Sequence, residues 1–413
     1  MRMRVRQASR LSGGALARWI AGAAAALALA VSGCSGSLPE FNPFSSSGSP
    51  FGGPAEAPAA GPAPATIGAG GVRVGLLLPL SAPGNAGIVA QSMRNAAELA
   101  LAEFANPDIQ LIVKDDGGSA QSAQAAAQAA LAEGAEIIIG PLFSHAVAAA
   151  GQVTRGRSVP MIAFSTDASV AGRGIYLLSF SPESDVERVI AFAATKNKRS
   201  FVALLPDNAY GSVVEARFQE TVAEKRGRVV TLERYSAEKP QLTEQIKRVA
   251  AALRGADSLF IADSADTTPQ ILQLLAQNGI KPGRVQFIGT GLWDDAKLFS
   301  NPGLAGAWFA APEATGYQAF AQRYKARFGR DPVRTASLAY DAVSLIAALV
   351  KSQEPGRFSP ETLANPSGFA GIDGVFRFKA DGTSERGLAV FEIRGNAARV
   401  ISPSPKSFTG PGL

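Results

Sequence analysis

The chain has 413 residues, 46% of them hydrophobic and 18% charged, which is long enough for more than one lobe with its own core. Its 40 Lys and Arg against 34 Asp and Glu give a net charge of +6, but five of the arginines lie within the first 18 residues and the rest of the chain is close to neutral. This balance excludes the basic surface typical of nucleic-acid-binding proteins, and a single cysteine excludes a fold held by disulfides.

The first 34 residues have the pattern of an export signal. The arginines precede an apolar run over residues 19–30, which ends in the small residues of Val31-Ser32-Gly33-Cys34. The run is shorter than the roughly 20 residues that span a bilayer. Val-Ser-Gly-Cys resembles the bacterial lipobox, in which the cysteine is acylated and becomes the first residue. An ordinary signal-peptidase site beside a free thiol is the alternative, but the unique, correctly placed Cys34 favours lipidation.

Residues 35–71 are rich in Gly, Pro, Ser and Ala. Such a composition buries too little apolar surface to offset the entropy of the chain, so we expect a flexible linker. It would hold a folded domain at some distance from a membrane surface.

From residue 72 onward, short apolar strands alternate with amphipathic helices. In a first block we expect strands at 72–79, 109–114, 137–139 and 160–164, and helices at 86–104, at 119–133 and from 144. In a second block we expect helices at 184–197, 209–226, 240–253 and 268–278, and strands at 201–205, 228–235, 259–262 and 285–288. Helices at 314–328 and 335–351 follow, and late strands at 374–378 and 387–393 could complete the sheets. This order predicts an α/β fold with two doubly wound parallel-sheet lobes.

Doubly wound sheets bind ligands beyond the carboxyl ends of their strands, where this chain places hydroxyl and acidic residues. No chemical motif stands out among them. His145, the single histidine, follows Ser144, but neighbours on a helix point about 100° apart, and no Gly-x-Ser-x-Gly elbow is present. No ligand cluster indicates a metal and no glycine-rich loop indicates a nucleotide. We therefore expect a binding protein rather than an enzyme, with no cofactor.

An ordered set of segments resembles the type I periplasmic solute-binding proteins, specifically the branched-chain amino-acid (leucine/isoleucine/valine) group. The matching segments are 74–81, 115–116, 138–141, 159–166 and 207–211. The resemblance implies two lobes joined by three crossovers. It places residues 72–180 and 313–372 in an N-terminal lobe, and residues 181–312 and 373–405 in a C-terminal lobe.

The resemblance also implies a ligand site between the lobes. Hydroxyl and backbone N–H groups near Ser144, Ser165 and Thr166 would hold a ligand carboxylate, and Tyr210 would contact the ligand from the second lobe. The loop 289–293, where the family carries an acid for the ligand ammonium, has none. Asp263 and Asp294 are the remaining candidates for that role.

Two functions of different classes remain open at this point. One is a lipid-anchored receptor that delivers an amino acid or a similar small molecule to an ABC permease. The other follows from segments 76–81 and 140–143, which also look like the lipoprotein activators of penicillin-binding proteins; these share the fold and act on peptidoglycan synthesis. Both imply the periplasm, and Ser35 after the cysteine favours the outer membrane over the inner one.

Overall fold

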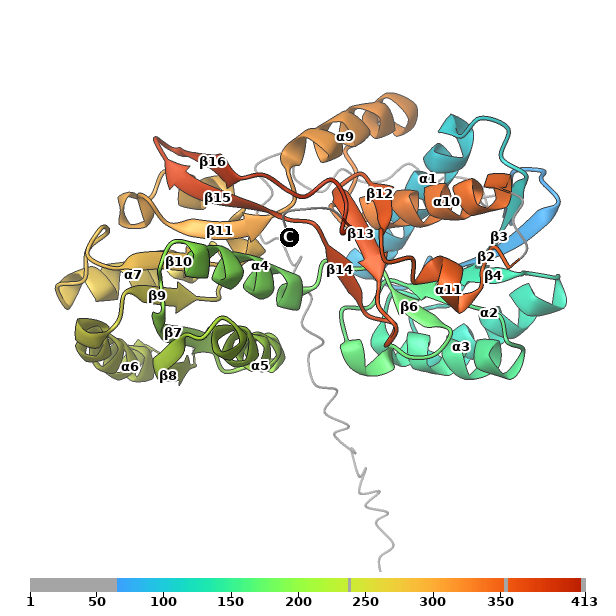
Figure 1. Cartoon of the computed structure of the whole chain (residues 1–413). Coiled ribbons are helices and arrows are strands. Elements are labelled where there is room, and N and C mark those ends of the chain that lie inside the picture. Colours follow the sequence, from blue (N-terminus) through green and yellow to red (C-terminus); the bar gives the residue numbers. More distant parts are fainter. Residues whose placement is uncertain (1–64, 237–238, 353–355, 410–413) are drawn as a thin grey trace, which may run out of the picture. The chain divides into compact units, whose positions relative to one another are not determined.

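The computed structural model describes residues 65–236, 239–352 and 356–409. Cys34, the export signal and the linker as far as residue 64 lie outside these residues. The described chain forms an α/β fold with two lobes, each built on its own mainly parallel sheet, as predicted (Figure 1).

The first sheet has six strands in the order β1-β3-β2-β4-β5-β6. Strands β2 to β6 run parallel to their neighbours, and β1 pairs antiparallel with β3. The strands are β1 (Thr66–Ile67), β2 (Val72–Leu78), β3 (Ile109–Asp115), β4 (Ile137–Ile139), β5 (Met161–Ala163) and β6 (Ile175–Leu177). The short β1 and β6 lie at the two edges and are absent from the sequence prediction.

Helices cover both faces of the first sheet. They are α1 (Asn85–Glu103), α2 (Ala120–Ala132), α3 (Ser144–Gly156), α9 (Ala314–Phe328) and α10 (Ala336–Ser352). Successive residues of a strand point to opposite faces, so Leu76 and Leu78 pack with α1, α9 and α10, whereas Leu77 packs with α2 and α3. Helix α10 lies beside α1 although it is more than 200 residues later in the chain (Figure 1). The first lobe therefore combines two distant segments.

The second sheet has seven strands in the order β16-β15-β11-β10-β9-β7-β8. Strands β7 to β11 run parallel to their neighbours, and β15 and β16 join antiparallel beside β11. The strands are β7 (Ser200–Pro206), β8 (Arg228–Tyr235), β9 (Ser258–Ile261), β10 (Gln286–Gly289), β11 (Trp308–Ala311), β15 (Ala389–Arg394) and β16 (Ala397–Ser402). Of these, β11 and β16 are absent from the sequence prediction.

Two pairs of helices cover the faces of this sheet. They are α4 (Pro182–Thr195) and α5 (Ala209–Glu224) on one face, and α6 (Lys239–Ala252) and α7 (Thr268–Gln277) on the other. Short helical segments connect the remaining parts: α8 (Ala296–Phe299), α11 (Pro360–Leu363) and the 3₁₀ turns Ala168–Val170, Leu253–Gly255, Gly291–Trp293 and Pro302–Leu304.

A third, antiparallel sheet corrects one prediction. Of the two late strands that could complete the large sheets, 387–393 does so as β15, but 374–378 does not. It forms β13 (Gly374–Phe378), between β12 (Phe369–Gly371) and β14 (Ser384–Arg386). The reason is packing, because Phe376 and Phe378 lie in the core of the first lobe.

The turn between β13 and β14 is fixed against the first sheet. The backbone N–H of Leu177 donates to the carbonyl of Gly382 at 2.8 Å. Gly382 has a φ of 86°, and a Cβ there would overlap the carbonyl oxygen of Ile175. Only glycine suits this position, and it brings the hairpin turn, residues 379–383, to the edge of β6.

Candidate functional site

The loops that follow β4 and β5 carry the predicted hydroxyl residues of the first lobe. Ser144 is the first residue of α3. Ser165 is only 5% exposed, and its Oγ accepts a hydrogen bond from the backbone N–H of Asp167 at 3.1 Å. Thr166 follows it and lines a cavity described below. Of these three residues, Thr166 is the one that lines the cavity.

Tyr210 lies at the carboxyl end of β7, in the first turn of α5. Asn208 caps this helix, accepting from the N–H of Gly211 at 2.9 Å. The Tyr210 side chain points into the lobe, where it is 5% exposed and its hydroxyl lies 2.8 Å from Oγ1 of the fully buried Thr290. Burial is also the main cause that raises the pKa of Tyr210. The hydroxyl is therefore already paired within its own lobe.

Asp263 is paired in a similar way. It follows β9 and accepts a hydrogen bond from the hydroxyl of the buried Tyr235, and one from the N–H of Ser264 at 2.6 Å. Burial raises the pKa of Asp263, although these donors oppose the shift. As with Tyr210, the polar atoms of this predicted site residue have partners inside the protein.

Asp185 is a carboxylate that the sequence analysis missed. It lies in the first turn of α4, and its Oδ2 accepts from the N–H of Gly291 at 2.9 Å. Burial raises the pKa of Asp185 to about 7, and the nearby charges of Glu183 and Asp294 add to this shift. The hydrogen bond from Gly291 opposes it. An acid therefore adjoins the loop 289–293 after all, supplied by a segment 106 residues earlier. Acidic residues are common in the first turn of a helix because the helix dipole stabilises them there, so the sequence position of Asp185 did not indicate its contact with this loop.

Asp294, the last of the predicted residues, ends the 3₁₀ turn after β10. It keeps access to solvent but is surrounded by protein, and this desolvation raises its pKa against the attraction of Arg334. Asp294, Asp185 and Glu183 thus form one group of neighbouring carboxylates on the second lobe.

Arg334 is held in a paired, partly buried position. It makes two hydrogen bonds to the fully buried Asp373, at 2.9 and 2.6 Å, and its guanidinium lies over the rings of Phe180 and Tyr317. Despite burial, Arg334 holds the pKa of Asp373 below its usual value. A second arginine, Arg386, also lies over the Phe180 ring, with its guanidinium carbon 5.1 Å from the ring centroid. These contacts fix the segments around Phe180 and Asp373.

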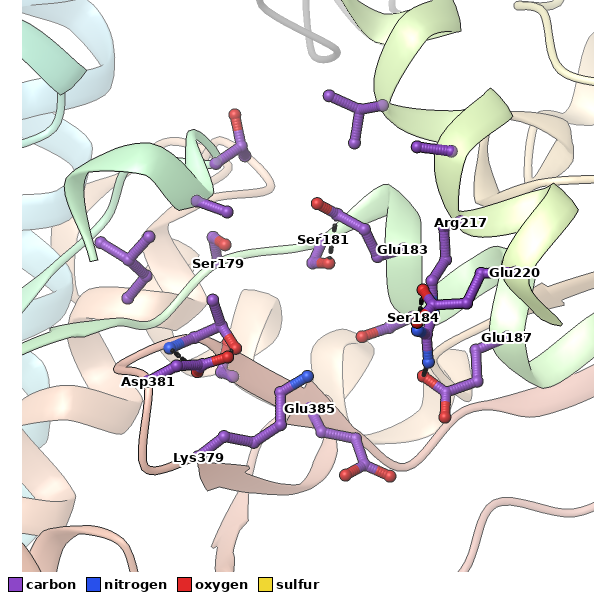
Figure 2. A pocket seen from close by; sticks show the side chains of 17 residues that line it. Ser179, Ser181, Glu183, Ser184, Glu187, Arg217, Glu220, Lys379, Asp381 and Glu385 are labelled. Carbon is purple, nitrogen blue, oxygen red and sulfur yellow. Dashed lines mark hydrogen bonds and ion pairs between the residues drawn. The ribbon is translucent and has the colours of Figure 1, made fainter. Parts of the chain in front are cut away.

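A cavity of about 380 Å³ lies where four segments of the chain meet (Figure 2). Its lining comes from the loop after β5, the segment from β6 into α4, the outer side of α5 and the β13–β14 hairpin. These residues are Thr166, Ala168, Leu177, Ser179, Ser181, Glu183, Ser184, Glu187, Val213, Ala216, Arg217, Glu220, Lys379, Asp381, Thr383, Ser384 and Glu385. Thr166 is the predicted site residue among them; Ser144, Ser165, Tyr210, Asp263 and Asp294 do not line this cavity.

Two polar residues of the first lobe, His145 and Asp115, have structural partners. Nε2 of His145 lies 2.8 Å from the carbonyl oxygen of Gly118, and its ring stacks on Phe143. Asp115 accepts from the N–H groups of Ser81 and Gly117. Within the residues that the structure describes, no group of His, Cys, Asp and Glu is arranged to hold a metal ion. The same residues include no helix of the length and apolarity needed to cross a membrane.

Comparison with known proteins gives a family match and a set of similar folds. A family model described as periplasmic binding protein matches residues 71–398. A structure of a putative branched-chain amino acid ABC transporter protein from Rhodospirillum rubrum is 19% identical, with a TM-score of 0.71, covering 80% of this chain and 99% of that one. An ABC transporter substrate-binding protein from Desulfitobacterium hafniense, in complex with Leu, is 18% identical with a TM-score of 0.57, covering 80% and 99%.

An uncharacterised protein of Rickettsia prowazekii is 21% identical over 203 residues, which is 49% of this chain. The chain spans about half the length of this curated relative, 52% of it. At these identities the solved structures establish the fold alone.

Proposed function

The chain belongs to the periplasmic binding protein family, and from this premise we propose that it is the solute-binding component of an ABC importer. One observation carries the proposal: the family match over residues 71–398 includes the strands of both large sheets from β2 to β15 and every residue that lines the cavity. Small-molecule sites are usually clefts or cavities of roughly 300–1,000 Å³ with a few placed polar groups, and the volume of this cavity, about 380 Å³, lies in that range.

The proposed ligand is a small amino-acid-like molecule. Thr166 would contribute its hydroxyl and backbone groups from the loop after β5, as the sequence predicts. On the second lobe, Glu183 lines the cavity and lies near Asp185 and Asp294, so it is the carboxylate proposed for a cationic group. The Desulfitobacterium hafniense structure holds Leu, which supports an amino-acid-like ligand for this fold without assigning one to this chain.

A thermal-shift screen of amino acids, small amides and short peptides tests this proposal on the processed protein. A true ligand at 100 times its Kd stabilises the folded state by about 2.7 kcal/mol. Thr166→Val should weaken binding by about 1–3 kcal/mol because a donor is lost. Thr231→Val is the control, because the Thr231 hydroxyl donates at 2.8 Å to a carbonyl of its own strand, Val230, away from the cavity.

We further propose that acylated Cys34 anchors the mature protein to a bacterial membrane on its periplasmic side, with the outer membrane favoured. A single acyl chain binds only marginally, so stable attachment requires the several chains of a bacterial lipoprotein. Cys34→Ala should leave a soluble or unprocessed protein in cell fractionation. Wild-type protein in the soluble periplasmic fraction, with its N-terminus at residue 35 or later, would argue against the anchor.

A second candidate function is activation of a penicillin-binding protein. The observation that favours it is the pairing of Tyr210 with Thr290 and of Tyr235 with Asp263. The hydrogen bonds of these groups are made within the protein, so they do not require a ligand. On this alternative, the screen gives no shift with any solute, and variants of Thr166 and Tyr210 keep their cell-envelope function. That combined result would make us abandon the transport function.

A further inference from the structure

The charges that line the cavity are unequal. Two of the lining residues, Arg217 and Lys379, are basic, whereas five are acidic: Glu183, Glu187, Glu220, Asp381 and Glu385. Three negative charges are therefore in excess. Because a cavity surrounded by protein screens charge less than open water does, this excess disfavours anions and favours cations.

The ion-pair partners of these side chains show that the excess negative charge lies on the side of the cavity formed by α4 and α5. Arg217 pairs at 2.7 Å with Glu187 and at 2.6 Å with Glu220, so one cation serves two carboxylates. Glu183 accepts the hydroxyl of Ser181 at 2.6 Å and makes no ion pair with any described residue. The negative side of the cavity is thus the wall formed by α4 and α5.

The hairpin side is different. Glu385 pairs at 2.7 Å with Arg377, outside the cavity, and Asp381 accepts from the N–H and hydroxyl of Thr383. The side chain of Lys379 makes no hydrogen bond or ion pair in the described part of the chain, although its charge helps to hold the pKa of Asp381 below the usual value. It extends from the hairpin into the space that faces α4 and α5 (Figure 2). A cation is therefore available on the wall opposite the carboxylates.

Four of the seventeen lining residues are apolar, namely Ala168, Leu177, Val213 and Ala216. The methylene groups of the longer polar side chains add further apolar surface. Discrimination between solutes by this cavity therefore rests on its charges.

We propose that this cavity selects a basic zwitterion, a small molecule with a carboxylate and an additional cationic group. The cationic group would lie against Glu183 and the carboxylates of α4 and α5, and the carboxylate would bind Lys379. The inference rests on the proposed solute-binding function and adds the charge of the solute and the residues that select it.

Isothermal titration of the processed protein with four probes tests this selection. L-arginine has both charged ends, L-citrulline is its neutral side-chain counterpart, agmatine lacks the carboxylate, and L-leucine is aliphatic. L-arginine should bind at least about tenfold more tightly than each of the others, since one charge-assisted hydrogen bond accounts for about this factor.

Matched variants of α5 test the negative wall. Glu220 and Glu215 lie on the same helix, and each pairs with an arginine at 2.6 Å, but only Glu220 lines the cavity. Glu220→Gln and Glu183→Gln should each raise the Kd for L-arginine by about three- to tenfold, whereas Glu215→Gln should leave this Kd unchanged. Lys379→Met should weaken the binding of L-arginine by about tenfold, whereas agmatine, which has no carboxylate, should bind as tightly as before or more tightly.

The possible results separate this inference from the proposed function. If L-leucine binds as tightly as L-arginine and Glu183→Gln has no effect, the charge selection is wrong while solute binding stands. If L-arginine binds but Lys379→Met weakens agmatine equally, the assignment of the carboxylate to Lys379 is wrong. If none of the probes nor any solute in the wider screen binds, the inference falls together with the proposed function.

Discussion

Two kinds of polar region in this molecule differ in how their groups are satisfied. At the strand ends and near Asp373, hydroxyls and charges are buried and paired inside the protein: Tyr210 with Thr290, Tyr235 with Asp263, and Arg334 with Asp373. Around the cavity, charged side chains keep access to solvent, and within the described residues the Lys379 ammonium makes no hydrogen bond or ion pair. The comparison shows that a residue in the expected sequence position can be structural, because pairing and burial decide what a polar group is free to bind.

The largest expected effect concerns the two arginines of these regions. Arg334→Met should lower the free energy of unfolding by about 3–5 kcal/mol, because it leaves the buried carboxylate of Asp373 without its main partner. Arg217→Met should cost less than about 1 kcal/mol, since its pairs with Glu187 and Glu220 are partly exposed. Urea denaturation followed by circular dichroism measures both. Equal losses would remove the distinction between the two regions.

A smaller effect is expected at Tyr210. Tyr210→Phe should destabilise the fold by about 1–3 kcal/mol, because the fully buried hydroxyl of Thr290 loses its partner. Adding Thr290→Val should recover most of this loss, since replacing both partners by apolar groups removes the unsatisfied atom. Thermal denaturation of the two variants compares them. If Tyr210→Phe abolishes solute binding with no loss of stability, Tyr210 belongs with the ligand-binding groups instead.

The smallest expected effect is on the pH dependence of stability, and it concerns Asp185, a paired carboxylate that lies near the cavity residue Glu183. The pKa of Asp185 is about 7, above its ordinary value of 3.8, so the folded state holds a proton that the unfolded state releases between these two values. Stability should therefore fall as the pH rises through this window. Asp185→Asn keeps an acceptor for the Gly291 N–H and removes that fall, which should stabilise the protein by about 1 kcal/mol at pH 8 and not at pH 4.

Asp331→Asn is the control for this comparison, because Asp331 is exposed and pairs at 3.0 Å with Lys325. Its effect on stability should be small at both pH values. If the stability of the wild type and of Asp185→Asn depended on pH in the same way, the pKa of Asp185 would not be raised by burial and by the neighbouring carboxylates.

Much of the fold is predictable because its signals are local. The strand predicted at 228–235 coincides with β8, and the helix predicted at 314–328 coincides with α9. Apolar runs and helical spacing are properties of neighbouring residues, and they predict the elements and the two mainly parallel sheets. Edge strands such as β6 and β16 carry weaker signals, because they are short or exposed.

The site is less predictable. Of the residues that the sequence predicts, Thr166 lines the cavity, and its role in ligand binding stays a prediction; Glu183 and Lys379 also line the cavity but are not among the predicted residues, and neither is Asp185. Acids in the first turn of α4 are equally well explained by the helix dipole, and a lysine beside a hairpin turn is an ordinary surface residue. The predicted roles of Ser144, Ser165, Tyr210, Asp263 and Asp294 in ligand binding remain to be tested by the variants and screens above.

The sequence by itself determined the export signal pattern, the alternation of strands and helices and the family resemblance, because each depends on short stretches of chain. Tertiary structure alone decided that Asp185 adjoins Gly291, that Arg334 pairs with Asp373, and that the 379–383 turn meets β6. The cavity is bounded by segments that are distant along the chain. Its charge is set by how those segments pack, and local patterns in the sequence carry no information about that packing.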